Sequence, residues 1–206
     1  MAGLRLDRLQ PHGLRPIDLT LAASELAFVS GPSGSGKSLL LRAIADLDPH
    51  PGEAWLDDQR RSDLAPPEWR RRVGLLPATT HWWAERVGEH FPTPPGVNGE
   101  DPLGRLLEQL GLGPETLEWT VARLSTGERQ RLALVRLLAN APEVLLLDEA
   151  TANLDPLNQT RVEGLIQDYR TRHRAAVLWV SHDPGQRRRL GGRHLVIEAG
   201  RLEATP

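Results

Sequence analysis

A glycine-rich run from Gly31 to Ser38 matches the pattern G-x-x-x-x-G-K-[ST], which cradles the phosphates of a nucleotide. Glycines allow a tight curl that points backbone N–H groups at phosphate oxygens, and the positive end of a following helix adds to this attraction. Lys37, the only lysine in the sequence, can reach the β- and γ-phosphates, and the Ser38 hydroxyl can bind Mg²⁺. A plain strand–helix turn is the alternative, but the complete motif after an apolar run favours a nucleotide site, formed by Gly31, Pro32, Ser33, Gly34, Ser35, Gly36, Lys37 and Ser38.

Two adjacent carboxylates, Asp148 and Glu149, follow the apolar run Val144 to Leu147. Asp148, at the end of a predicted strand, can hold Mg²⁺ through the water shell of the ion. Glu149, one residue later, can accept a proton from an attacking water or orient that water. By itself the pair is equally typical of a surface turn after a buried strand. Beside a phosphate loop, it predicts a hydrolytic site.

Short apolar runs alternate with helical patterns along the chain, which is typical of an α/β fold with a mostly parallel sheet. Two further short strands are predicted around Ala199 and Gly200. The predicted core strands are 25–30, 73–76, 144–147 and 176–181, and the helix after the phosphate loop is 37–47.

The middle of the chain has a different pattern, because apolar residues such as Leu103, Leu106, Leu107 and Leu110 recur there at helical spacing. We therefore predict a single domain over 1–206, with a core of about 1–83 and 141–206 and a helical subdomain inserted at about 84–140. Breaks near the start of that subdomain are predicted at Pro92, Pro94, Pro95, Gly96 and Gly99.

The composition limits the possible partners. Lysine and arginine total 25 and aspartate and glutamate 27, so the net charge of −2 gives no footprint for nucleic acid, and none is expected as a partner. The arginine runs at 70–72 and 187–189 are predicted to be solvated helix faces. The absence of cysteine excludes thiol nucleophiles and cysteine-ligated metals. No run approaches the roughly 20 apolar residues of a membrane span, so a cytoplasmic location is expected.

A third motif, Leu124-Ser-Thr-Gly-Glu-Arg-Gln-Arg131, resembles the signature motif of ATP-binding-cassette (ABC) ATPases, usually L-S-G-G-Q. The segments 150–155 and 181–183 resemble the loop after the acidic strand and the switch histidine of that family. The resemblance extends from about Leu4 to Glu203. It implies a P-loop NTPase with a mostly parallel core sheet, a small N-terminal antiparallel β part and an inserted α-helical subdomain.

The resemblance implies that Mg-ATP is hydrolysed between two copies of the chain in a head-to-tail homodimer. ATP on the phosphate loop of one copy would meet the signature segment of the other, Ser125, Thr126, Gly127 and Glu128. Glu149 would be the catalytic carboxylate, His182 would contact the γ-phosphate, and Asp155 would link the two sites. A separate transmembrane subunit would be the partner, which would hold this chain at the inner face of the cell membrane.

Three positions depart from the family pattern. Thr126 adds a Cβ to the signature, and Glu128 places a carboxylate either near the phosphate or in a favourable first-turn position of a helix. Ala78 stands where the family has a glutamine that senses Mg²⁺ and the membrane partner, and Thr79, Thr80 and His81 are the possible substitutes. The family often stacks an aromatic residue on adenine; here His12 either stacks or is a surface loop histidine.

Trp82 and Trp83 follow the missing glutamine, in a region that lines the docking groove for the membrane subunit in the family. They either form a partner surface or fill the core of the helical subdomain. The run Ala176 to Asp183 resembles the small ATPase subunits of bacterial iron-export transporters. The alternatives to a transporter motor are a soluble, non-transport ABC ATPase and a regulatory ATP-binding module with little turnover.

Overall fold

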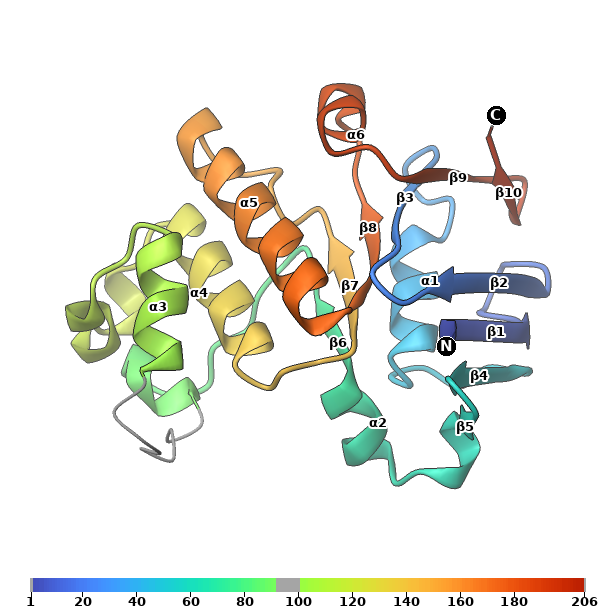
Figure 1. The fold of residues 1–206 in the computed structure, drawn as a ribbon, viewed down its shortest axis with the longest axis horizontal. Coiled ribbons are helices and arrows are strands. Elements are labelled where there is room, and N and C mark those ends of the chain that lie inside the picture. The colour runs from blue at the N-terminus through green and yellow to red at the C-terminus, as the bar shows by residue number, and fades with distance from the viewer. Residues whose placement is uncertain (1, 92–100, 206) are drawn as a thin grey trace.

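The computed structural model describes residues 2–91 and 101–205. The breaks predicted between Pro92 and Gly99 lie outside these residues. Two sheets form the core of the described part, one of six strands and one of four. Helix α1 (Lys37–Ile44) lies between the two sheets (Figure 1). On the far side of the larger sheet lie α3 (Pro102–Gln109), α4 (Thr126–Leu138) and α5 (Pro156–His173).

The larger sheet has the strand order β10-β9-β3-β8-β7-β6. Its strands from β9 to β6 pair in parallel, and only β10 pairs antiparallel. This confirms the predicted α/β fold with a mostly parallel sheet. Most of the predicted strands are found within a residue of their expected limits, as β3 (Leu26–Ser30), β6 (Val73–Leu76), β7 (Val144–Asp148), β8 (Ala176–Val180), β9 (Arg193–Glu198) and β10 (Arg201–Ala204).

The smaller sheet is antiparallel and has the order β2-β1-β4-β5. Its apolar residues alternate along the strand, as in the buried–exposed pattern of β2, and pack onto one face of α1. The opposite face of α1 packs on the larger sheet, so this helix is covered on both sides. The strands are β1 (Ala2–Leu9), β2 (Ile17–Ala22), β4 (Glu53–Leu56) and β5 (Gln59–Arg60).

The other face of the larger sheet is covered by α4 (Thr126–Leu138) and α5 (Pro156–His173). Neighbouring residues of one strand point to opposite cores: Leu146 belongs to the α1 side, whereas Leu145 and Leu147 belong to the α4–α5 side. All three are fully buried, which explains why this strand reads as one continuous apolar run.

The described part of about 84–140, the range predicted as an inserted helical subdomain, is mostly helical and includes α4. Its one longer helix before α4 is α3 (Pro102–Gln109), which begins at Asp101, whose side chain accepts a hydrogen bond from Gly104 N at 2.8 Å. Single 3₁₀ turns complete the described part of this segment, at Val87–His90, Pro114–Glu118 and Val121–Arg123. Elsewhere the chain forms a 3₁₀ turn at Arg61–Asp63 and the helices α2 (Pro66–Arg72) and α6 (Pro184–Leu190).

In residues 2–91 and 101–205, no helix is both long and apolar enough to cross a membrane.

Several arginines of the two runs, 70–72 and 187–189, form hydrogen bonds that the sequence did not predict. Arg72 donates from Nε to Glu143 Oε1 at 2.6 Å, and Arg189 donates from Nη2 to Glu163 Oε1 at 2.8 Å. Arg187 donates to a histidine ring nitrogen at 3.0 Å. Arg70, Arg71, Arg188 and Arg189 are exposed, as expected of solvated helix faces, whereas Arg72 and Arg187 are partly buried. Local charge spacing does not show these hydrogen-bond partners.

Trp69 anchors α2 to the core, since its side chain is fully buried and its indole N–H donates to Ile44 O at 2.9 Å. Replacing it with alanine is expected to lower the free energy of unfolding by about 3–5 kcal/mol, because the cavity cannot fully collapse. Trp69→Phe keeps most of the ring packing and is expected to cost less. Urea denaturation measures both losses, and equal losses would contradict this account.

Candidate functional site

The phosphate loop curls between β3 and α1 as a result of its glycines. Gly31, Gly34 and Gly36 have φ angles of 143°, 75° and 100°, a region that L side chains rarely adopt. A Cβ at Gly36 would also lie 2.7 Å from Leu14 Cδ2. The loop therefore requires glycine both for its backbone conformation and for space. The Oγ of Ser35 in this loop is buried and has no hydrogen-bond partner, which fits a loop built to surround an anion.

Lys37 is only 7% exposed, and its ammonium folds back over the loop. Its Nζ donates to Gly31 O at 3.0 Å and to Pro32 O at 2.8 Å. The positive charge of Lys37 is thus held close to where phosphate oxygens would lie. A phosphate can replace the two carbonyls as the acceptor of its hydrogen bonds.

The end of β7 lies against the start of α1. Ser38 Oγ donates to Asp148 Oδ2 at 2.6 Å, although the two residues are 110 positions apart in the chain. A hydroxyl and a carboxylate in contact are hard oxygen donors of the kind that Mg²⁺ prefers, together with waters and nucleotide phosphates. The residues present therefore fit the predicted Mg²⁺ site.

Glu149 leaves the sheet in a strained conformation with φ of 51°, which is uncommon for a residue with a side chain. Its Oε1 lies 3.3 Å from Nε2 of His182, and both side chains are partly exposed. The backbones of the two strand ends are joined by Glu149 N donating to Val180 O at 3.1 Å. The structure thus brings Lys37, Ser38, Asp148, Glu149 and His182 to one edge of the sheet, at the carboxyl ends of β3, β7 and β8.

The signature segment does not join this group within the chain. Ser125 is the N-cap of α4, and with Glu128 it forms a capping box: Glu128 N donates to Ser125 Oγ at 3.2 Å, and Ser125 N donates to Glu128 Oε2 at 2.9 Å. The Ser125 hydroxyl also donates to Glu128 Oε2 at 2.7 Å. Hydrogen bonds from the Ser125 backbone and side chain hold the pKa of Glu128 below its ordinary value. Glu128 therefore occupies the first-turn position that the sequence offered as one of two alternatives, and Thr126 and Gly127 form the first turn with it.

Asp155 is the N-cap of α5 and lies outside the group as well. It accepts from Asn158 N at 3.1 Å and from Asn158 Nδ2 at 2.5 Å, and the bond from the Asn158 backbone lowers its pKa. Its side chain is exposed.

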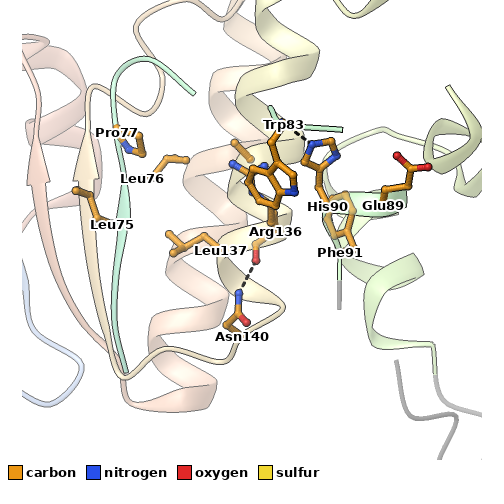
Figure 2. A pocket seen from close by; sticks show the side chains of 11 residues that line it. Leu75, Leu76, Pro77, Trp83, Glu89, His90, Phe91, Arg136, Leu137 and Asn140 are labelled. Carbon is orange, nitrogen blue, oxygen red and sulfur yellow. Dashed lines mark hydrogen bonds between the residues drawn. The ribbon is translucent and has the colours of Figure 1, made fainter. Parts of the chain in front are cut away.

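A groove of about 420 Å³ lies beside Ala78, where the family glutamine is missing. Trp83, His90 and Arg136 lie together on its wall (Figure 2). Trp83 is 72% exposed, whereas Trp82 packs partly buried on the core, so only Trp82 fits the alternative in which the pair fills the core. The groove is lined by Leu75, Leu76, Pro77, Trp83, Glu89, His90, Phe91, Ala133, Arg136, Leu137 and Asn140.

His90 and Arg136 fix the shape of this groove. The Nε2 of the buried His90 accepts from the backbone N–H groups of Trp83 and Ala84, both at 3.0 Å. The Arg136 guanidinium lies 4.7 Å and 4.9 Å from the ring centroids of Trp82 and Trp83, and it donates to His81 O at 3.1 Å. Of the possible substitutes for the glutamine, Thr80 accepts from the Trp82 indole at 3.3 Å.

Sequence reasoning missed His90, Arg136 and the buried Gln186. Each is an isolated polar residue in a helix or turn, so no local pattern marks it. His12 is exposed in the turn between β1 and β2.

A phosphate loop after β3, a histidine after the adjacent strand β8 and an acidic pair at the end of β7, the next strand over, define a phosphate-loop nucleoside triphosphatase. The family model described as "ABC transporter" matches residues 14–152. The chain therefore belongs to the ABC transporter family, as an ATP-binding subunit with ATPase activity, which confirms the resemblance seen in the sequence.

Two curated relatives illustrate the match. The aliphatic sulfonates import ATP-binding protein SsuB 2 of Frankia alni is 37% identical over 191 residues, which cover 92% of this chain and 73% of that protein. The "Probable iron export ATP-binding protein FetA" of Escherichia coli (strain K12) is 35% identical over 175 residues, which cover 82% of this chain and 78% of that protein. A solved bacterial Atm1-family ABC exporter with ATP bound superposes on the fold with a TM-score of 0.81 at 21% identity, covering 97% of this chain and 37% of that one.

Replacing Glu128 with alanine removes half of the capping box of α4 and is expected to lower the free energy of unfolding by about 1 kcal/mol at neutral pH. Because the pKa of Glu128 is lowered in the folded protein, this stabilisation is present above the ordinary pKa of 4.5 and is lost as the pH falls through the folded-state value. Urea denaturation at neutral and acidic pH measures the difference. The wild type and the variant should converge in acid; Glu108→Ala, on the exposed face of α3, is the control.

Proposed function

We propose that this subunit hydrolyses Mg-ATP in two composite sites formed by a homodimer, and that it thereby drives a separate transmembrane subunit. The observation that carries the proposal is the division of the site residues within one chain. Lys37, Asp148, Glu149 and His182 gather at one edge of the sheet, whereas the capped end of α4 at Ser125 has its side-chain bonds only with Glu128 among the described residues. The second half of the site is supplied by another copy.

In this mechanism the phosphate loop and Lys37 bind the β- and γ-phosphates, and Ser38 and Asp148 hold Mg²⁺. The metal ion, when bound, neutralises charge on the phosphate oxygens. Glu149 orients a water toward the γ-phosphorus and accepts its proton as the bond to the β-γ bridging oxygen breaks. His182, in contact with Glu149, hydrogen-bonds the γ-phosphate and keeps the carboxylate aimed at the water.

The partner copy contributes the first turn of α4, where Ser125, Thr126, Gly127 and Glu128 present a helix N-terminus to the γ-phosphate. Asp155, exposed at the N-terminus of α5, links the two sites. The arrangement is isologous, because the same two surfaces meet twice. In this proposal residues 1–206 form one ABC domain, with the core at about 1–83 and 141–206 and the helical subdomain at about 84–140.

The groove beside Ala78 is the docking site we propose for the transmembrane subunit. Trp83 leaves most of its ring exposed there, and an exposed tryptophan on an apolar wall is typical of an interface anchor. The subunit would then work as a peripheral protein on the cytoplasmic face of the cell membrane. His90 and Arg136 take the place of the glutamine in holding this segment relative to α4.

Iron export is the transport process we propose, because the run Ala176 to Asp183 resembles iron-export ATPase subunits and FetA is among the relatives. The sulfonate-import relatives support the competing assignment. The membrane subunit that copurifies with this chain decides between the two, since the transported species contacts that subunit.

Glu149→Gln is expected to trap an ATP-bound dimer, because the groups that bind ATP remain while the carboxylate that activates water is lost. Size-exclusion chromatography with light scattering in Mg-ATP measures the dimer, and steady-state turnover should fall by about 100-fold or more. A Glu149→Gln protein that stays monomeric at all protein concentrations would contradict the composite site.

Lys37→Ala is expected to abolish tight ATP binding, because it removes the one point charge that faces the phosphates from within the loop. Isothermal titration calorimetry with Mg-ATP measures the loss, and circular dichroism checks that the variant is folded. Arg42→Ala, at an exposed position of the same helix, is the control and should bind ATP as the wild type does. Unchanged affinity in Lys37→Ala would refute the assigned role.

A further inference from the structure

Helix α6 begins two residues after His182, with Asp183 as its N-cap, so a shift of this helix would also move the histidine. Asp183 caps the helix by accepting from Gly185 N at 2.7 Å, and its own N–H donates to Ser181 Oγ at 3.1 Å. With only seven residues, α6 has little stability of its own. Its position must therefore be set by side chains that bind it to the rest of the domain.

One set of contacts joins α6 to the loop that carries Glu149. Gln186 is 1% exposed, and its Nε2 donates to Thr151 Oγ1 at 2.9 Å and to Glu163 Oε1 at 3.0 Å. Arg189 donates to the same Glu163 oxygen at 2.8 Å. Thr151 lies two residues after Glu149, so this buried amide ties the helix after His182 to the turn after the catalytic carboxylate.

A second set of contacts joins α6 to the strand that leads into the phosphate loop. Arg187 Nη1 donates to His194 Nε2 at 3.0 Å, and Ser30 Oγ lies 2.9 Å from the same nitrogen. An arginine can only donate, so Nε2 must be the unprotonated nitrogen, and Nδ1–H is left to donate to Thr205 Oγ1 at 2.8 Å. Burial, with a contribution from the Arg187 charge, lowers the pKa of His194 and favours this neutral form. Ser30 is followed directly by Gly31, the first residue of the loop.

We propose that Gln186 and Arg187 are positioning residues that hold His182 between the phosphate loop and Glu149. The proposal rests on the role proposed above for His182 at the γ-phosphate. Helix α6 is fixed from two sides, by Thr151 after one catalytic strand and, through His194, by Ser30 at the end of another. Within the described residues, the His182 ring has a polar contact with Glu149 only, so the position of His182 is set by these anchors.

Arg188 provides a matched control on the same helix. It is exposed, and it forms no hydrogen bond or ion pair within the described residues, whereas its neighbours on both sides do. Arg187→Gln and Arg188→Gln remove the same charge from α6, but only the first removes an anchor. Gln186→Leu removes the other anchor at nearly constant volume.

The test measures kcat and KM for ATP in Arg187→Gln, Gln186→Leu and Arg188→Gln, with thermal unfolding of each. Arg187→Gln and Gln186→Leu are expected to lower kcat about tenfold or more while KM stays near the wild-type value, since misplacement of the histidine harms the transition state more than ATP binding. Arg188→Gln should resemble the wild type. The same substitutions in a His182→Ala background should then have no further effect on kcat, because the residue through which they act is absent.

Losses of kcat that remain undiminished in the His182→Ala background would overturn the proposal and leave a purely structural role. So would unchanged kcat in both anchor variants. A readout without turnover uses Glu149→Gln as the parent: adding Arg187→Gln should weaken its ATP-dependent dimer, and adding Arg188→Gln should not. A Glu149→Gln parent that never dimerises contradicts the composite site itself, whereas a parent that dimerises equally well with either addition contradicts only the anchoring role.

Discussion

The parallel pairing of β3, β8 and β7 is the constraint on which the site depends. Asp148 pairs with Val180 in register, so the carboxylate, the histidine strand and the end of the loop-bearing strand meet at one edge. The hydrogen bond of Ser38 with Asp148 closes this edge over a separation of 110 residues. A shift of one residue along β7 would turn Asp148 to the other face of the sheet and separate it from Ser38. The two apolar cores, which lock each strand from both faces, are therefore what keeps the phosphate chemistry together.

Helix α1 is placed so that one element serves both stability and binding. It is covered by sheets on two sides, and its N-terminal end carries the loop. The packing that fixes the helix also fixes the direction of its dipole toward the phosphates. Within the site, positive φ angles occur at the loop glycines and at Glu149, the point where the chain leaves the sheet.

Sequence reasoning found the parts of this protein whose functional residues lie close together along the chain. The loop from Gly31 to Ser38, the strand before Asp148 and the capped start of α4 each lie within about ten residues, so spacing and pattern suffice. The contacts that hold α6 and the groove do not have this property. Gln186 meets Thr151 and Glu163, and Arg136 meets two tryptophan rings, through tertiary packing that no local pattern encodes. For the same reason, the sequence pattern of the two arginine runs does not show that Arg72 and Arg189 have specific hydrogen-bond partners.

The position of the Lys37 ammonium, folded back over the loop, bears on the rate of nucleotide binding. A buried cation without an acceptor would collapse or disorder the loop, but here the carbonyls of Gly31 and Pro32 accept its hydrogen bonds. The hydrogen bonds of Lys37 thus give the loop the shape that a phosphate needs, and a bound phosphate would exchange one set of oxygen acceptors for another. Little ordering entropy is lost on arrival, so capture of the nucleotide is governed by encounter rather than by refolding of the loop. In the proposed homodimer, the slow steps of the cycle would then be the association and dissociation of the two copies.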